Sequence, residues 1–320
     1  NIAAAVGSGT ILYGAMAWRF HRDDFRMASL YGVPEGSSLV DWPIGPEDLA
    51  PWYDRVEAEL GIAGDAARHS HEATPRPAYA MPPLPAAPQT ATLARGAAAL
   101  GIHTTVPPLA INSVPRQGRG ACIGCGSCVG FPCPSDAKNG AHNTFIARAR
   151  ATGRCELVTG AVVTRIDTDH SGRVVGVSFA GADGSIRQVR ARNVVLAASA
   201  IETARLLLNS PSAREPHGLG NNTDQVGRHL QGHVYPQAYG LFDHEVHGSA
   251  GPGVTIGTTQ FNHGNPGIVG GGLIADDFVL PPILFWKSCL PPDLPRWGAA
   301  ATHFMREKFR EVLRLTGPLH

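Results

Sequence analysis

Four of the six cysteines of this 320-residue chain lie close together in one short stretch. They are Cys122, Cys125, Cys128 and Cys133, spaced Cys-x2-Cys-x2-Cys-x4-Cys-Pro, and glycines between them let a short loop wrap a small object. Thiolates this crowded repel one another unless a cation or cluster takes up their charge, or they oxidise in pairs. The stretch therefore predicts an iron–sulfur cluster, a structural zinc ion, or a set of disulfides or free thiols.

The spacing of these cysteines is similar to that of bacterial ferredoxins, with one extra residue before the last Cys. A three-iron cluster held by three of the thiolates, or a four-iron cluster held by all four, would carry electrons to an external acceptor. Cys155 and Cys289 stand alone in the sequence, and we expect them in the hydrophobic core.

A second candidate for chemistry is the small-residue stretch near the start of the chain, residues 6–14. Gly7 and Gly9 would let the backbone approach a flat or anionic ligand closely, and Thr10 adds a hydroxyl group. An ordinary turn has the same composition, so the stretch alone does not decide between the two.

Helical elements must position these loops. Pro46 suits a first helical turn, Glu47 and Asp48 complement the positive end of a helix, and Gly61 ends it, which predicts a helix over 46–60. Its apolar residues share one face and are expected to pack: Leu49, Trp52, Tyr53, Val56 and Leu60. We expect an extended surface excursion over 66–88 and a helix over 90–100.

The chain becomes β-like after residue 156. Strands are expected over 161–166, 174–179 and 186–191, with a hairpin turn at Asp183-Gly184. Residues 193–198 are apolar on both faces, as a buried parallel strand must be, and lead into a helix over 201–208. The start of such a helix can meet a cofactor phosphate or ring edge, although an ordinary strand–helix unit reads the same way.

The last part of the chain reads as short strands with Gly-rich turns, which could form a sheet that carries a substrate pocket. A helix over 302–315 is expected near the end.

Composition bounds the function. There are 27 basic and 26 acidic residues, so no charge excess favours nucleic acid or an anionic membrane surface. The longest apolar runs fall far short of the roughly 20 residues of a membrane-spanning helix. The length suggests roughly two domains.

Three stretches, in order, resemble the glucose–methanol–choline (GMC) oxidoreductase family. Residues 5–14 resemble its Gly-rich flavin-contacting loop. Trp42-Pro43 and the stretch 48–57 resemble its Trp-Pro and Leu-x-Pro-Tyr-Tyr…Glu segment. Residues 197–207, closed by Gly218-Leu219-Gly220, are similar to its Ala-Ala-Gly-Ala…Leu-Leu signature.

The resemblance implies contacts to flavin adenine dinucleotide (FAD). They would come from Val6, Gly7, Ser8, Gly9 and Thr10, from Tyr13 and Gly14 near the isoalloxazine ring, from the backbone of Val163 at the adenine, and from Ala198 and Ser199.

This sequence also departs from the family pattern. Ser199 stands where Gly is usual, and His229 and Gly232 replace an Asn and an Asp. The phosphate-binding Gly-x-Gly-x-x-Gly stretch and the His-Pro-x-Gly-Thr-like segment have no match in the sequence. We therefore expect the chain to be the middle of a longer enzyme whose catalytic His lies beyond His320.

The resemblance implies an α/β fold, mixed α+β, with an incomplete Rossmann-like FAD-binding domain and a substrate domain that contains an antiparallel sheet. The expected FAD-binding domain comprises 1–30 and 155–235, and the substrate domain comprises 31–154 and 236–320.

The implied function is oxidation of a CH–OH group of an alcohol, sugar or sterol-like substrate, with hydride transfer to flavin N5. A cytochrome or another electron acceptor is an expected partner, and the compartment, bacterial periplasm or cytoplasm, stays open. The alternative is an iron–sulfur or metal-binding electron-transfer module.

Overall fold

The computed structural model describes residues 3–68, 76–246, 250–277 and 282–317. The chain folds into two compact units, which are described one at a time. Unit 1 comprises Asn1–Arg154 and His233–His320, and unit 2 comprises Cys155–Gly232. Part of the expected excursion over 66–88, residues 69–75, lies outside the described residues. The division into a flavin domain and a substrate domain stays a prediction.

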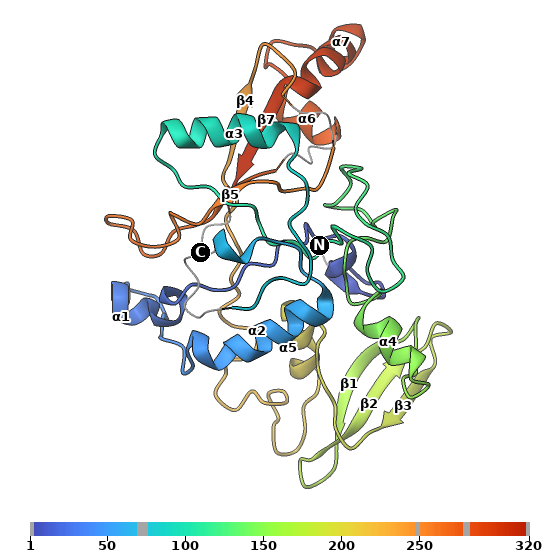
Figure 1. Cartoon of the computed structure of the whole chain (residues 1–320). Coiled ribbons are helices and arrows are strands. Elements are labelled where there is room, and N and C mark those ends of the chain that lie inside the picture. Colours follow the sequence, from blue (N-terminus) through green and yellow to red (C-terminus); the bar gives the residue numbers. More distant parts are fainter. Residues whose placement is uncertain (1–2, 69–75, 247–249, 278–281, 318–320) are drawn as a thin grey trace. The chain divides into compact units, whose positions relative to one another are not determined.

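Unit 2 contains a three-stranded antiparallel sheet and one helix (Figure 1). The strands are β1 (Val162–Thr168), β2 (Val174–Ala180) and β3 (Ile186–Arg190), in that order, and α5 (Ala200–Leu208) packs against β1. The hairpin turn predicted between β2 and β3 is confirmed. Gly184 has a φ of 76°, which suits glycine, and the Asp183 carboxylate accepts hydrogen bonds from the backbone and hydroxyl of Ser185.

The buried parallel strand expected over 193–198 is wrong. These residues form no strand, and Val195 is 90% exposed. A strand needs a neighbour for its backbone hydrogen bonds, and none of the described strands pairs with this segment. The helix that follows it was predicted correctly. Its buried residue is Leu206, whereas Ile201 and Leu208 face solvent.

Most helices belong to unit 1. The predicted helix over 46–60 is α2 (Pro46–Leu60), with the predicted bounds. The backbone amide of Gly45 donates to the Asp48 carboxylate at its start, and Gly61 ends it with a φ of 86°. The second predicted helix is α3 (Pro88–Ala99). The other helices of unit 1 are η1 (Ser8–Ile11), η2 (Asp23–Arg26), α1 (Met27–Tyr31), η3 (Ala66–Arg68), α4 (Phe145–Ala151), α6 (Pro282–Cys289), α7 (Ala299–Lys308) and η4 (Phe309–Glu311).

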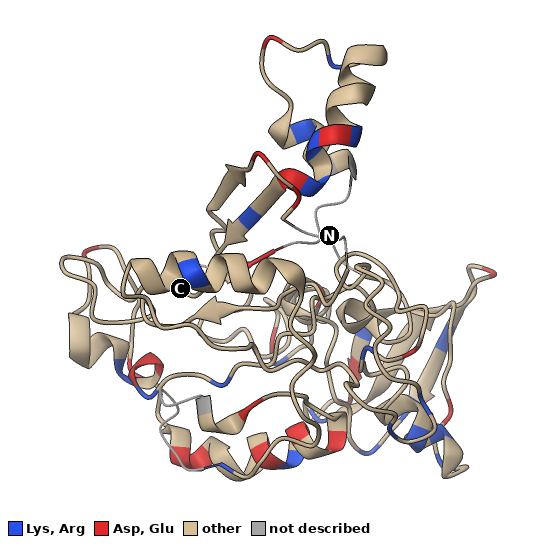
Figure 2. Ribbon diagram, turned by 45° about the horizontal axis from the view of Figure 1, so that its top comes forward, with Lys and Arg blue, Asp and Glu red and all other residues tan. Residues whose placement is uncertain are grey.

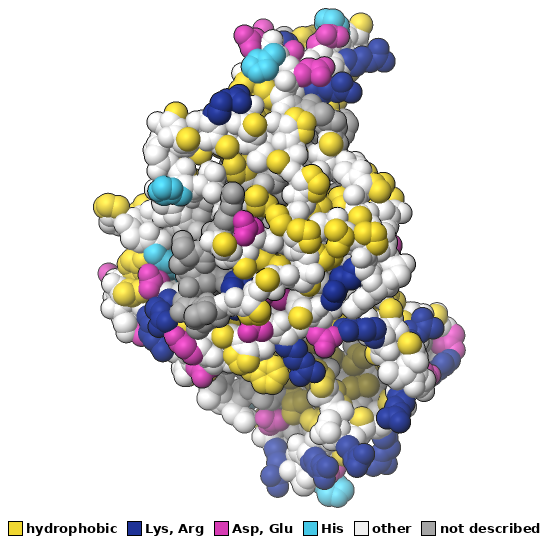
Figure 3. Space-filling view, viewed as in Figure 1, with side chains coloured by type: hydrophobic (Ala, Val, Ile, Leu, Met, Phe, Trp, Pro, Cys, Tyr) yellow, Lys and Arg dark blue, Asp and Glu magenta, His cyan; other side chains and the backbone are white. Residues whose placement is uncertain are grey.

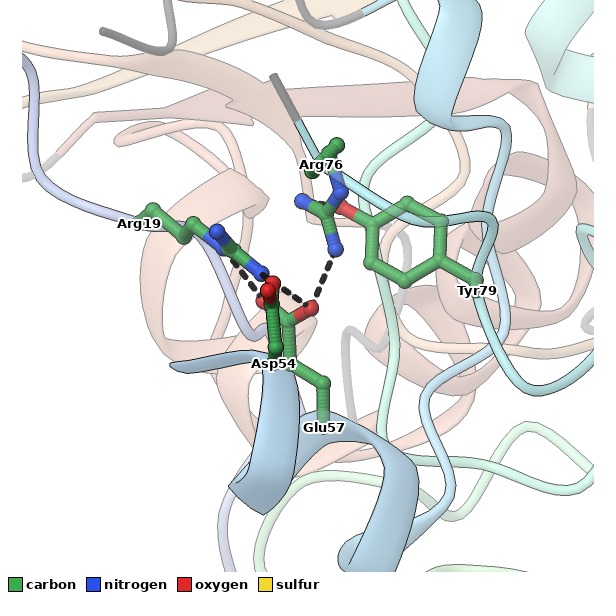
Figure 4. A network of polar contacts seen from close by, with 5 residues as sticks. All are labelled: Arg19, Asp54, Glu57, Arg76 and Tyr79. Carbon is green, nitrogen blue, oxygen red and sulfur yellow. Dashed lines mark hydrogen bonds and ion pairs between the residues drawn. The ribbon is translucent and has the colours of Figure 1, made fainter. Parts of the chain in front are cut away.

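The face that α2 buries differs from the expected apolar stripe. Trp52 and Val56 are exposed, and the buried residue is Glu57. Figure 4 shows why: two arginines from distant parts of the chain converge on the Glu57 carboxylate. Arg19 binds both of its oxygens at 2.8 Å, and Arg76 pairs with the same group. A buried carboxylate requires such partners.

The last part of unit 1 forms the predicted second sheet. It has the order β4 (Gln237–Leu241), β7 (Val312–Thr316), β6 (Ile274–Asp276), β5 (Gly257–Thr258), and every neighbouring pair is antiparallel. The expected helix over 302–315 is therefore wrong in its second half, because the chain leaves α7 and η4 and enters β7. That strand pairs on both sides, and Val312 and Leu313 are buried. These non-local contacts outweigh a continued helix.

The main core of unit 1 joins segments far apart in the sequence. Leu109 and Ile111 pack with Ala15, Ile62 and Met81. Tyr13 and three of the clustered cysteines, Cys122, Cys128 and Cys133, pack against the same cluster. The small-residue loop and the cysteine loop therefore rest on one scaffold.

Acidic and basic residues are interspersed along the ribbon (Figure 2). Apolar side chains are scattered over the face in Figure 3. The exposed large apolar residues of the chain include Val40 and Trp297. In the ranges that the structure describes, no helix has the length and apolarity needed to cross a membrane.

Candidate functional site

The small-residue loop turns sharply at its glycine. Gly7 has a φ of 96° and Ser8 a φ of 47°, so two successive residues lie in the left-handed region. Within this turn the Ser8 amide donates to the Ala5 carbonyl at 2.8 Å, and the Thr10 amide donates to the Gly7 carbonyl at 3.1 Å. A Cβ added at Gly7 would lie 2.8 Å from the His142 ring, so only glycine fits there.

Residues 139–142 hold this loop in place. The Thr10 hydroxyl donates to the Gly7 carbonyl and accepts a hydrogen bond of 3.0 Å from the Ala141 amide. The Tyr13 hydroxyl donates to the Asn139 carbonyl, and burial raises the pKa of Tyr13 to about 12. Thr10 and Tyr13 therefore fix the loop, and neither side chain is free to move without breaking a contact.

The outer side of the loop is open. Val6, Ser8 and Gly9 are exposed, and a Cβ added at Gly9 would meet nothing within 4 Å. At Gly14 an added Cβ would lie 3.3 Å from Val129, so the far end of the loop is tighter. A rigid backbone with small side chains on its open side suits the approach of a flat ring, so these residues fit a flavin.

The remaining expected flavin contacts lie in unit 2. Val163 is in β1, an edge strand, so alternate backbone groups of that strand face away from β2. The pairing register of β1 shifts between Val163 and Arg165, which disrupts the ladder locally. Ala198 and Ser199 are exposed at the start of α5. Their roles in flavin binding stay predictions.

Two departures from the family pattern coincide with unusual backbone geometry. Ser199, where Gly is usual, has φ 78° and ψ 168°, a region that is almost confined to glycine. His229, where Asn is usual, has a φ of 58°, in the left-handed region that Asn tolerates better. The backbone thus keeps the conformation that the family residues would favour.

The cysteine loop is anchored by its backbone rather than by its thiols. The Cys122 amide donates to the Asn112 carbonyl at 2.8 Å, and the Gly130 amide donates to the Leu12 carbonyl at 2.7 Å. All six cysteines of the chain are free thiols in the structure. Cys289 packs in a hydrophobic cluster as expected, but Cys155 is exposed, so its predicted burial is wrong.

The four loop thiols lie in different environments. Burial raises the pKa of Cys122, and it raises the pKa of Cys128 to about 11. Burial would also raise the pKa of Cys133, but hydrogen bonds from the Ser135 hydroxyl and from backbone amides hold it below its usual value. Cys125 is exposed. The surroundings therefore favour ionisation of Cys133 over ionisation of Cys122 or Cys128.

These thiols do not fit a metal or an iron–sulfur cluster as they stand. Across the described ranges, no group of three or more His, Cys, Asp or Glu side chains is arranged to hold a metal ion. We therefore derive no electron-transfer step through this loop.

Lys138 was not singled out from the sequence, yet it joins the two loops. It is only 2% exposed, and its ammonium group donates to the carbonyls of Tyr13 (3.0 Å), Phe131 (3.1 Å) and Cys128. Burial lowers the pKa of Lys138. In the sequence, only the position of Lys138 soon after a Cys-Pro pair could have pointed to this role. Its three partners are backbone carbonyls, which every residue has, so no side-chain pattern marks them.

The second sheet of unit 1 borders a cavity of about 640 Å³. Its wall is mostly apolar and includes Ala238, Phe261, Ile268, Leu273 and Leu315. A cavity of this size can accept a small organic molecule. A substrate pocket on this sheet was predicted from the sequence, and that role stays a prediction.

Most of this chain is similar to known proteins of one enzyme family. A family model described as GMC oxidoreductase matches residues 4–235. The chain is 36% identical to paromamine 6'-oxidase from Streptomyces fradiae, over 74% of this chain and 42% of that protein. It is 32% identical to the fructose dehydrogenase large subunit from Gluconobacter japonicus, over 73% of this chain and 42% of that one.

A third relative is 2-methyl-1,2-propanediol dehydrogenase from Mycolicibacterium austroafricanum, which is 33% identical over 72% of this chain and 40% of that protein. The chain thus spans less than half the length of these curated relatives.

Proposed function

Because the chain belongs to the GMC oxidoreductase family, we propose that it forms part of an FAD-dependent enzyme that oxidises a CH–OH group to a carbonyl. The observation that carries this proposal is the family match over 4–235, which includes the rigid, open loop at Gly7–Thr10 and the start of α5. When bound, FAD supplies the hydride acceptor, its N5 atom.

The residues of this chain have a binding and orienting role in that reaction. Thr10 and Tyr13 hold the loop rigid from behind, so its open side offers a preformed surface to the flavin ring. Val163, Ala198 and Ser199 are proposed as the further contacts. The hydroxyl proton of the substrate must pass to a base, and the resemblance assigns this role to a His beyond His320.

We propose a polyhydroxylated substrate of the sugar, amino sugar or diol class. Support comes from the names of the three relatives, which specify paromamine, fructose and 2-methyl-1,2-propanediol. The apolar cavity on the second sheet could contact the carbon skeleton of such a substrate, while hydroxyl groups would need polar partners elsewhere.

The electron acceptor is proposed to be either oxygen or an external carrier protein. One relative is named an oxidase, which supports oxygen as the acceptor, and another is named a dehydrogenase, which supports an external carrier. The alternative of a free-standing electron-transfer module is not favoured, since the family match covers an enzyme fold and the described thiols form no metal site.

The test is to express the complete coding sequence that contains this chain and to record its absorption spectrum. A flavin spectrum that bleaches anaerobically with a sugar or diol, and recovers with oxygen or a dye, supports the proposal. A purified, folded protein without flavin, or one whose flavin no alcohol of a broad panel bleaches, would contradict it. Iron, sulfide and zinc analysis of an anaerobic preparation tests the cysteine loop separately, and bound iron with sulfide, or zinc at one per chain, would contradict the conclusion that these thiols hold no metal.

A further inference from the structure

One wall of the cavity on the second sheet is a closed loop, residues 261–272. Phe261 and Asn265 are among the residues of this loop that line the cavity. The two ends of the loop are joined, because the Gly272 amide donates to the Phe261 carbonyl at 2.9 Å. The side-chain amide of Asn265 donates to the same carbonyl at 2.8 Å and to the Gly270 carbonyl at 2.9 Å. These bonds keep the shape of the loop, so the point at which the loop is attached decides where this wall of the cavity lies.

His263, which lies between Phe261 and Asn265 in the sequence, attaches the loop to η2 and α1. Its Nε2 is 2.9 Å from the Asp24 carboxylate in η2, and its Nδ1 is 3.0 Å from the Tyr31 hydroxyl in α1. A carboxylate only accepts hydrogen bonds, so Nε2 carries a proton and donates to Asp24. In the neutral ring, Nδ1 then accepts the hydrogen bond of the Tyr31 hydroxyl. Asp24, His263 and Tyr31 together form what we call the loop clamp.

The partners of His263 are themselves held in place. The second carboxylate oxygen of Asp24 accepts a hydrogen bond of 2.6 Å from the His21 amide. The Tyr31 hydroxyl accepts one of 3.2 Å from the Gly264 amide, and the Tyr31 ring stacks on the His263 ring with the centroids 6.1 Å apart. Only 10% of the His263 side chain is exposed. The clamp is therefore a fixed point from which the loop extends to the cavity.

The hydrogen bonds of His263 indicate a positioning role. Both ring nitrogens bond to protein groups, so neither is left to exchange a proton with a substrate. An apolar ring would fill the same space without the cost of burying two nitrogens. Hydrogen bonds, unlike apolar contacts, fix direction as well as distance, which suits a residue that must hold a loop in one place.

We propose that His263 is a positioning residue for the substrate, because it holds residues 261–272 as a preformed apolar wall against the carbon skeleton of the substrate. The inference rests on the proposed function, since it takes the cavity as the substrate pocket. A preformed wall favours binding because the loop loses no freedom when the substrate arrives. Without the clamp, the substrate has to order the loop, and this cost weakens binding and raises KM.

The test uses the complete flavin-loaded enzyme and the sugar or diol that bleaches its flavin. His263→Phe keeps a ring beside Tyr31 but removes both hydrogen bonds. We expect KM to rise about 3- to 10-fold, as the loss of one or two hydrogen bonds implies, with kcat within about 2-fold of the wild type. His263→Gln keeps an N–H group for Asp24 and a carbonyl for Tyr31, so its KM should lie between the two. His303→Phe, at an exposed position of α7, is the matched control and should leave KM unchanged.

A double-mutant cycle tests whether the effect passes through the clamp. Tyr31→Phe removes the hydroxyl that bonds to His263 and leaves its ring in place, so it should raise KM as well. Two residues that act through one contact have non-additive effects. The double variant should therefore raise KM no further than the larger of the two single substitutions. Effects that multiply in the double variant would overturn the clamp.

The outcomes separate this inference from the proposed function. A folded His263→Phe enzyme with the KM of the wild type would overturn the role of His263 and leave the flavin assignment intact. A lower kcat at unchanged KM would also overturn it, because binding would then not depend on the loop. A wild-type enzyme whose flavin no alcohol bleaches would instead refute the proposed function, and this inference with it. If His263→Phe does not fold, Tyr31→Phe provides the comparison, and an unchanged KM there overturns the inference.

Discussion

Ser199 has a backbone conformation that residues with a Cβ rarely adopt. At φ 78° and ψ 168° the strain costs on the order of 1–3 kcal/mol. We expect Ser199→Gly to raise the free energy of unfolding by about 1 kcal/mol, less than the full strain because glycine makes the unfolded chain more flexible. Urea titration measures this change.

Ser199→Ala is the control for this prediction. It should leave stability within about 0.5 kcal/mol, since the serine side chain makes no capping hydrogen bond. A stabilising Ala variant or a destabilising Gly variant would contradict the strain argument.

Asp276 illustrates a second effect of a single residue. Its side chain is buried at the second sheet, where it accepts hydrogen bonds from the Thr255 amide (2.6 Å), the Ile256 amide (2.9 Å) and the Thr255 hydroxyl (2.7 Å). Burial nevertheless raises the pKa of Asp276 above its usual value of 3.8. The folded state therefore binds the proton more tightly than the unfolded state, and this contribution to stability is present at low pH and lost as pH rises through the folded pKa.

We therefore expect Asp276→Asn to change how stability depends on pH. Between pH 7 and pH 4 the wild type should gain stability relative to the variant, because Asn cannot take up the proton. Denaturant unfolding of both proteins at the two pH values gives the difference. Asp183→Asn is the control at an exposed turn, where hydrogen bonds from Ser185 lower the pKa below 3.8, so its difference should stay nearly constant between pH 7 and pH 4. An Asp276→Asn difference that is independent of pH would refute the expectation.

At the scale of elements, Lys138 connects the small-residue loop to the cysteine loop. Its ammonium group binds carbonyls at Tyr13, Cys128 and Phe131, and no other described side chain bonds to both loops. Lys138→Met keeps the aliphatic stem but leaves three carbonyls without this donor, so we expect a loss of roughly 3 kcal/mol in the free energy of unfolding. The half-buried Cys128 should also react faster with a thiol reagent.

Lys287→Met, on the exposed side of α6, is the control and should change neither the free energy of unfolding nor the labelling of Cys128. Unchanged labelling of Cys128 in a folded Lys138→Met protein would show that the lysine does not brace the loops.

Local sequence signals predicted elements well where the determinants lie inside the element. The bounds of α2 follow from Pro46, Asp48 and Gly61, all of them at its ends. The hairpin between β2 and β3 follows from Asp183-Gly184 and the alternating strands beside it. Capping and turn geometry act over a few residues, so the sequence contains the whole cause.

Elements whose state depends on distant partners were predicted poorly. Residues 312–315 look helical after α7, but pairing with β4 and β6 makes them a strand. Glu57 is buried because Arg19 and Arg76 converge on it from other segments. The same limit applies to the candidate site. The Gly7–Thr10 loop was identified from its composition, whereas Lys138 acquires its role only through contacts formed by the fold.

At the scale of the whole molecule, the apolar segment 193–198 leaves hydrophobic surface exposed, although Val194 and Leu196 are half-buried. Val195 is 90% exposed, and its backbone pairs with no described strand. Such a segment can pair with the same segment of another copy, so we expect concentration-dependent self-association of the isolated chain.

Val195→Lys should weaken this self-association, because charge on an unpaired strand opposes pairing between copies. Light scattering over a range of concentrations measures the effect. Val40→Lys is the matched control: Val40 is 71% exposed but lies outside any apolar run, so the same charge there should change association little. Equal effects of the two substitutions would assign the change to net charge, and no effect of Val195→Lys would show that residues 193–198 do not drive association.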